Sequence, residues 1–208
     1  SGSVPQALGA IGLAVVAAMV VGGLLGWLFE RVIVRPVYGQ HLKQILITLG
    51  GAIVGEEVIK MIRGPLQNPV HMPDALRGSF IVPVWGDSAA IAKYRVLAVV
   101  IGLLVFALLA WVLSRTKVGL LVRAGVQDRE MVESLGYQVK RLFVGVFVAA
   151  SALAALGGVL WGLYQESVYP QIGGQVNTLL FIVIIIGGLG STVGCFVGAL
   201  LVGLLANY

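Results

Sequence analysis

Charged residues are scarce in this chain. Asp, Glu, Lys and Arg make up 11% of its 208 residues, whereas 59% are hydrophobic. A soluble globular domain carries roughly 25% charged residues, so the composition departs strongly from that class. Cys195 is the only cysteine, which excludes an internal disulfide and gives no sign of a metal cluster. Glycine is abundant, with 29 residues, and such residues let membrane helices approach each other closely.

Motifs that carry chemistry are also missing. The sequence has no GxxxxGK[ST] phosphate-binding loop and no Ser-His-Asp or Cys-His arrangement. His41 and His71 lie in loops predicted to face opposite sides, so they do not form a metal site. The net charge of +5 does not indicate nucleic acid, because the basic residues sit in loops beside apolar runs. We therefore predict no enzymatic activity, no catalytic residue, and no metal or cofactor held by this chain.

Long apolar runs fill most of the sequence and predict an all-α, polytopic membrane protein. About 20 apolar residues cross a bilayer core, and about five such spans are expected, at residues 7–29, 42–62, 94–114, 142–164 and 178–206. The first of these is expected to end at the step from Arg35 to Pro36. The last is too long for one simple span and contains GGLG at 187–190. We expect it to be kinked, or to consist of a half-helix, a break and a second helix.

Small residues recur at four-residue spacing in several spans, which predicts close helix contacts. Gly22 and Gly26 form one such pair, and Gly51 and Gly55 form another. Ala154, Gly158 and Gly162 share one face of the fourth span. The helix-packing glycines predicted near the C-terminus are Gly187, Gly188, Gly190, Gly194 and Gly198.

The polar stretch 115–141 separates two spans and holds six of the fourteen Lys and Arg residues. Basic loops stay in the cytoplasm, and the resulting orientation puts nine basic residues inside and five outside. It also places the start of the chain outside and its end inside. Leu120, Met131 and Leu135 are among the apolar residues that recur there at helical spacing, followed by Gly136. A short amphipathic helix outside the bilayer is predicted, ending at a left-handed glycine.

Glu56 and Glu57 are unusual because acidic side chains inside a span are costly and are often functional. Glu56 is four residues from Lys60, a spacing that favours structural pairing. Both carboxylates are also candidates for contact with a passing substrate or ion.

The polar loop that follows is predicted to face outward. Within it, Ser79 to Trp85 is predicted to be extended, although Pro83 argues against a central strand.

Four stretches resemble the LivH-type permeases of branched-chain amino acid ABC transporters, a family with urea and short-amide relatives. ERVIVRP at 30–36 is similar to the family's E-R-x-x-x-R-P signature, and ITLGGAIVGEEVIK at 47–60 to its T-x-G span. The stretch 115–141 resembles the family pattern R-T-x-x-G-x-x-x-R-A-x-x-Q-D-x-E, although Val132 stands where the family has Ala. The run 186–205 resembles its glycine-rich late span. The additional family spans that would precede and follow are missing, so 1–208 resembles the middle of one permease domain.

The resemblance implies a bacterial inner-membrane transport subunit with two permease subunits, alike or different, two cytoplasmic ATPases that bind ATP, and a periplasmic substrate-binding protein. It also implies that residues 115–141 form the coupling loop that docks on the ATPase. The coupling residues would be Arg123, Ala124, Gln127, Asp128, Arg129, Glu130, Val132, Leu135 and Gly136.

Three interpretations remain open at this point. The favoured one is an importer subunit for branched-chain or other small amino acids, or for urea or short amides, driven by a partner ATPase. A secondary transporter that couples to an ion through Glu56 or Glu57 is the second. A membrane scaffold without a transport role is the third.

Overall fold

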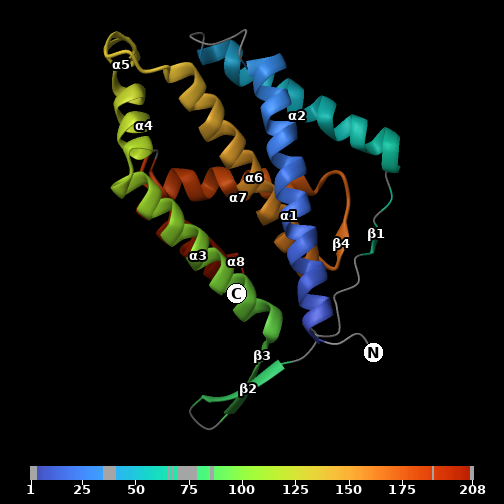
Figure 1. Ribbon diagram of the computed structural model, residues 1–208. Coiled ribbons are helices and arrows are strands. Elements are labelled where there is room, and N and C mark those ends of the chain that lie inside the picture. Colours follow the sequence, from blue (N-terminus) through green and yellow to red (C-terminus); the bar gives the residue numbers. More distant parts are fainter. Residues whose placement is uncertain are drawn as a thin grey trace.

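The computed structural model describes residues 4–34, 41–64, 66, 68–69, 79–84, 87–188 and 190–206. It is built of helices, with two small two-stranded β-ribbons at its periphery (Figure 1). Three described segments are long and apolar enough to cross a membrane: Gly12–Val34, Lys93–Arg115 and Val139–Gln165. The prediction of an all-α polytopic membrane protein is therefore confirmed.

The longest helix pair is α1 (Val4–Phe29) against α6 (Val139–Gln165). A Cβ on Gly22 would collide with the methyl group of Ala155, and one on Gly26 with the side chain of Ser151. The contact predicted for this glycine pair is confirmed, because only glycine lets the two helices approach so closely. Beyond Phe29, α1 continues as a π-helical segment, η1 (Glu30–Val34). The predicted stop at Arg35 and Pro36 lies outside the described residues.

The contact of α1 with α6 lies on the turns that precede most of the ladder of small residues. Gly23 approaches Val148 and Ala152 on α6, and the ring of Phe29 stacks on Phe147 with centroids 6.5 Å apart. A Cβ on Gly158 would meet nothing within 4 Å, and one on Gly162 would meet only Val168. The four-residue spacing therefore identified the face of α6 that α1 uses, but Gly158 on that face has no neighbour within 4 Å.

The helices α3 (Lys93–Arg115) and α6 are the two arms of an arch, which two short helices close at one end (Figure 1). At the other end the Tyr94 hydroxyl, at the start of α3, donates a hydrogen bond to the carbonyl of Leu160 near the end of α6. Tyr94 is buried there. The helices α3 and α6 are thus joined at both ends of the arch: by the predicted cytoplasmic loop at one end and by the Tyr94 hydrogen bond at the other.

Helix α2 (His41–Arg63) corresponds to the predicted second span but is not among the three membrane-length apolar helices. Its 23 residues are long enough, at about 1.5 Å each, to cross a bilayer core of about 30 Å. Charged residues near both of its ends distinguish it from the other spans. A Cβ on Gly51 would collide with the ring of Phe29, whereas one on Gly55 would meet nothing within 4 Å. Of the predicted pair, Gly51 therefore forms a close helix contact and Gly55 does not.

Two β-ribbons join the helices on the side away from the closed end of the arch. β1 (Asn68–Pro69) pairs with β4 (Ser167–Val168). β2 (Ser79–Val84) pairs antiparallel with β3 (Asp87–Ala92), with Pro83 opposite Ser88. Proline is tolerated because both strands of a two-stranded ribbon are edges. The extended segment predicted here is present, and its end at Trp85 lies outside the described residues.

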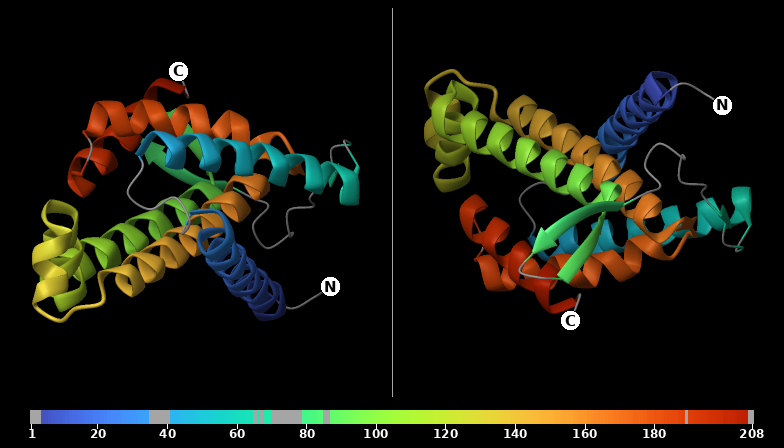
Figure 2. Two further views of the ribbon diagram at one scale, coloured as in Figure 1. Left: turned by 90° about the horizontal axis from the view of Figure 1, so that it is seen from above. Right: turned by 90° about the horizontal axis from the view of Figure 1, so that it is seen from below.

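The last apolar run forms a helical hairpin, α7 (Ile172–Gly187) and α8 (Thr192–Ala206). The break predicted near Gly187 to Gly190 is therefore confirmed. A Cβ on Gly198 would lie 2.9 Å from the carbonyl oxygen of Val183, so α8 runs back along α7. This return differs from the single crossing that would place the end of the chain inside. In both views of Figure 2 the hairpin and the start of α1 lie at opposite edges.

Candidate functional site

The closed end of the arch carries the predicted coupling loop, which consists of two helices. Helix α4 (Lys117–Gln127) begins after Thr116, whose hydroxyl accepts a hydrogen bond from the Gly119 amide at 3.4 Å. Helix α5 (Arg129–Ser134) follows directly. The sequence predicted one short amphipathic helix, and the structure divides it in two. We call residues 117–136 the elbow.

Asp128 makes the bend between the two helices. It ends α4, where its own amide donates to the Ala124 carbonyl at 2.9 Å, and its carboxylate accepts from the Met131 amide at 3.0 Å. An aspartate at this position satisfies an amide at the start of α5 that otherwise has no partner. Gly136 follows α5 with a φ of +86°, the left-handed conformation predicted from its place after the last apolar position.

The elbow is anchored to the spans by close packing. A Cβ on Gly119 would collide with the backbone of Leu113 in the last turns of α3. A Cβ on Gly125 would lie 3.4 Å from the side chain of Val139 at the start of α6. Val132 and Val139 are 4% and 1% exposed, so the inner side of the elbow forms a small core. The elbow is therefore packed against α3 and α6 and is not a loose loop.

The outer side of the elbow presents large apolar side chains. Val126, Met131 and Leu135 are 71%, 64% and 68% exposed. Val132 was predicted to dock on a partner together with Leu135, and the structure corrects this: Val132 is buried within the chain. Val126 and Met131 were absent from the predicted set. Each is the sequence neighbour of a buried residue, Gly125 or Val132, so it points about 100° away from the buried side of its helix.

The remaining predicted coupling residues occupy the polar surface of the same elbow. Arg123 bonds through Nε to the carbonyl of Gly119 at 3.4 Å, within α4. Arg129 pairs with Glu133 at 3.0 Å along α5. Gln127 and Glu130 are exposed, and Ala124 is half-buried. The elbow thus combines an apolar centre with a charged rim, a composition typical of protein-binding surfaces.

Glu56 and Glu57 lie near the far end of α2, away from the elbow. Lys60 Nζ is 2.9 Å from a carboxylate oxygen of Glu56 and 2.8 Å from one of Glu57. The pairing of Glu56 with Lys60 that the spacing predicted is confirmed. Glu56 also borders an apolar cavity of about 860 Å³ between α1, α2 and α7, which Phe29 and Asn177 help to line. A role of either carboxylate in a substrate path stays a prediction.

The five predicted packing glycines divide into two groups. Gly187, Gly194 and Gly198 are contact residues: a Cβ on Gly187 would lie 2.6 Å from the Cys195 backbone, and one on Gly194 would collide with the Gly187 carbonyl. Gly188 and Gly190 have φ values of +81° and +92°, and a Cβ on either would meet nothing within 4 Å. These two are turn residues and not packing residues, since their requirement for glycine comes from backbone conformation.

Comparison with known proteins places these features in a family. The family described as "Branched-chain amino acid transport system / permease component" matches residues 3–208. The chain belongs to this permease family. No solved structure matches it.

Among the relatives of this permease is the high-affinity branched-chain amino acid transport system permease protein LivH of Escherichia coli K12, 28% identical over 191 residues. The corresponding protein BraD of Pseudomonas aeruginosa is 29% identical over 192 residues. These alignments cover 91% and 90% of this chain and 61% of each relative. The fructose import permease protein FrcC of Rhizobium meliloti is 26% identical, over 93% of this chain and 54% of that protein.

The chain therefore spans about three-fifths of the length of these relatives. Family and membrane-length helices together identify a multi-pass permease component of the bacterial inner membrane.

Proposed function

We propose that this chain forms part of the permease subunit of an ATP-binding-cassette importer that translocates branched-chain or other small amino acids. In this proposal residues 1–208 contribute one membrane-spanning domain, and residues 115–141 form its coupling loop. The observation that carries the proposal is the elbow, which exposes Val126, Met131 and Leu135 while its inner side is fixed to two spans.

Large exposed apolar side chains rimmed by charge mark a site for a protein partner. A short helix that presents such residues fits a groove on another protein, as in helix-in-groove recognition. The partner that suits this surface is a cytoplasmic ATPase, because the sequence has no phosphate-binding loop and the energy must come from another subunit. ATP is then bound by the partner, and this chain carries no catalytic residue.

The rigid anchoring of the elbow supports a role in transmission. Gly119 packs on the backbone of α3 and Gly125 contacts Val139 of α6, so a movement of the elbow would be passed to the two arms of the arch. The β2–β3 ribbon lies at the opposite end of the molecule (Figure 1), where a periplasmic binding protein would deliver substrate. A second permease subunit, identical or homologous, would complete the path.

The docking surface is tested by the variants Leu135→Asp and Met131→Asp in the assembled transporter. An aspartate in an apolar groove is desolvated without a partner, so substrate-stimulated ATP hydrolysis should fall at least ten-fold, about 1.4 kcal/mol, while membrane insertion is unchanged. Leu135→Met is the matched control, because it keeps volume and apolar character and should retain coupling. Normal transport by both aspartate variants would refute docking through the elbow.

A second variant separates docking from folding. Val132→Ala removes buried methyl groups and should lower thermal stability, with ATP hydrolysis reduced only in proportion to the protein unfolded. Uncoupling by Val132→Ala at full stability would show that the buried residue, and not the exposed ones, faces the partner.

Substrate and energy source are tested by uptake assays. The relatives named above differ in substrate, so family membership leaves the choice between amino acids, urea and short amides to measurement. Labelled leucine and labelled urea should be compared in cells that overproduce the transporter.

Glu56→Gln and Glu57→Gln should leave leucine uptake nearly unchanged if the carboxylates serve structure through Lys60. Loss of an ion-gradient dependence in these variants would favour the secondary transporter, and unchanged uptake on deletion of the gene would favour the scaffold.

A further inference from the structure

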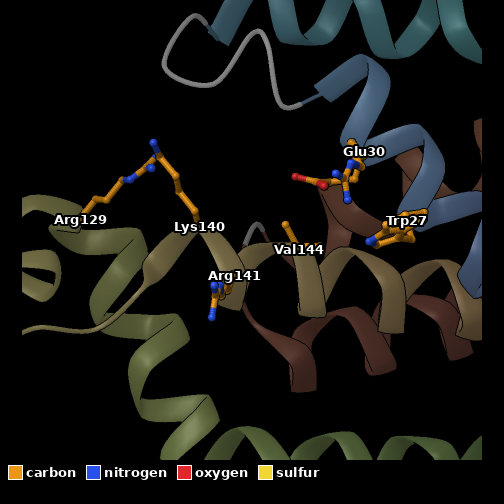
Figure 3. A pocket seen from close by; sticks show the side chains of 7 residues that line it. Trp27, Glu30, Arg129, Lys140, Arg141 and Val144 are labelled. Atoms are coloured by element: carbon orange, nitrogen blue, oxygen red, sulfur yellow. The ribbon is translucent and has the colours of Figure 1, made fainter.

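A basic cavity of about 730 Å³ lies beside the elbow, where α1, η1, α5 and α6 come together (Figure 3). It is separate from the exposed apolar residues of the elbow. Arg31, Arg129, Lys140 and Arg141 line it, and the acidic residue among its lining side chains is Glu30. At about 30 Å³ for each water, a space of this size holds on the order of two dozen water molecules, far more than a structural water site requires.

The positive charge of this cavity is only partly neutralised. Glu30 is 2% exposed, and Figure 3 shows its carboxylate directed toward the space that Arg129 and Lys140 also approach. Arg129 is paired with Glu133 at 3.0 Å. Within the described part of the chain, no carboxylate lies within ion-pair distance of Lys140 or Arg141. The excess positive charge faces a cavity large enough for an anion, and it therefore attracts one.

The cavity lies between the ends of two membrane-length helices, a position expected at the level of the lipid headgroups. Its residues come from the end of one span, Gly12–Val34, and from the start of another, Val139–Gln165. Trp27 forms part of the wall, and the Arg31 guanidinium lies 5.2 Å from the centre of its ring. Tryptophan with its amphipathic ring is characteristic of this interface. Val144 continues the apolar part of the wall toward the membrane interior.

We propose that this cavity binds the phosphate of an anionic phospholipid headgroup, such as phosphatidylglycerol. Lys140 and Arg141 supply charge to the phosphate, and Trp27 and Val144 contact the adjoining apolar part of the lipid. Basic pockets between membrane helices on the cytoplasmic side recognise headgroups in this way. A soluble phosphate ion shares the chemistry but gains nothing from the apolar wall. The test measures lipid binding and not transport, so it does not need the transported substrate.

The test uses the assembled transporter, delipidated and presented with phosphatidylglycerol or phosphatidylcholine, with bound lipid counted by native mass spectrometry. Lys140→Gln should weaken phosphatidylglycerol binding roughly five-fold, as expected for the loss of one interfacial charge of about 1 kcal/mol. Lys117→Gln is the matched control, because Lys117 is also exposed and lies on the same predicted side but outside the cavity. Binding by this control should equal that of the unmodified protein.

Four results would overturn the proposal. One is equal phosphatidylglycerol binding by the Lys140→Gln and Lys117→Gln variants. The second is binding of phosphatidylcholine equal to that of phosphatidylglycerol. The third is displacement of the lipid by inorganic phosphate at equal concentration, which would assign the cavity to a free anion. The fourth is lipid that binds only after the ATPase subunits are removed, which would make the cavity part of a protein interface. Retention of the lipid with the ATPase present, together with a selective loss in Lys140→Gln, is the expected outcome.

Discussion

Two glycine-lined helix contacts in this molecule are built differently. In the contact between α1 and α6, Gly22 and Gly26 face the small side chains of Ala155 and Ser151. In the hairpin of α7 and α8, glycines on both helices face backbone: Gly194 meets the Gly187 carbonyl, and Gly187 meets the backbone of Cys195. The nearest atoms in the first contact therefore belong to side chains, which can be replaced by smaller ones, whereas the nearest atoms in the second belong to the backbone and cannot be removed.

The difference explains what each contact can tolerate. A side chain added in the α1–α6 contact can be offset by trimming its partner, so the helices keep their separation. A side chain added in the α7–α8 hairpin can be accommodated only by moving the two helices apart, because a carbonyl group cannot be shortened. The hairpin should thus be the more sensitive of the two to the same substitution.

The largest effect is expected for Gly194→Ala in α8. Its Cβ would collide with the Gly187 carbonyl, at the upper end of the roughly 1–3 kcal/mol typical of overpacking. The free energy of unfolding in mixed micelles measures this cost, and uptake should fall with it. Gly203→Ala in the same helix is the matched control, since a Cβ there meets nothing within 4 Å. Equal stability of the two variants would show that the hairpin tolerates a side chain at Gly194, contrary to the comparison made above.

An intermediate effect is expected for Gly26→Ala in α1. Its Cβ would collide with the Ser151 side chain, and about 1–2 kcal/mol should be lost. Ser151→Gly removes the atoms in the way, so the double variant should be more stable than the sum of the two single changes predicts. The double-mutant cycle measures this coupling. Additive losses would mean that the backbone, and not the side chain, sets the distance between α1 and α6.

The smallest effect is expected for Gly158→Ala in α6, where the described residues leave open space around the new Cβ. Replacing a helical glycine by alanine in open space should raise stability by up to about 1 kcal/mol through helix propensity. The same unfolding titration on the isolated chain and on the assembled transporter sharpens the comparison. A loss of stability confined to the assembly would identify Gly158 as a contact with another subunit.

Much of this architecture follows from local sequence. The apolar runs gave the spans, the pair Gly22 and Gly26 gave a real contact, and the break near Gly187 to Gly190 follows from residues that tolerate positive φ. Gly136 ends the elbow for the same reason. These features are predictable because each depends on a few neighbouring residues and on steric limits that hold in any protein.

Which part of a helix face is covered was not predictable. Gly158 and Gly162 share a face of α6 with Ser151 and Ala155, yet α1 contacts Ser151 and Ala155 while a Cβ on Gly158 would meet nothing within 4 Å. Val132 and Leu135 lie one helical turn apart, and only the tertiary packing decides that Val132 is buried and Leu135 is exposed. The basic cavity was missed because it joins Arg31 to residues more than one hundred positions away. Periodicity reports which residues share a side and not which side is covered.

The return of α8 along α7 has a consequence for how the chain is inserted during synthesis. At about 1.5 Å per residue these helices of 16 and 15 residues are about 24 and 23 Å long, shorter than the hydrocarbon core of about 30 Å. Residues 142–208 contain no Lys or Arg, so this stretch has none of the positive charges that orient a span for the insertion machinery. A hairpin that enters and leaves on one side transfers no flanking segment across the bilayer, and it therefore needs no such topological signal.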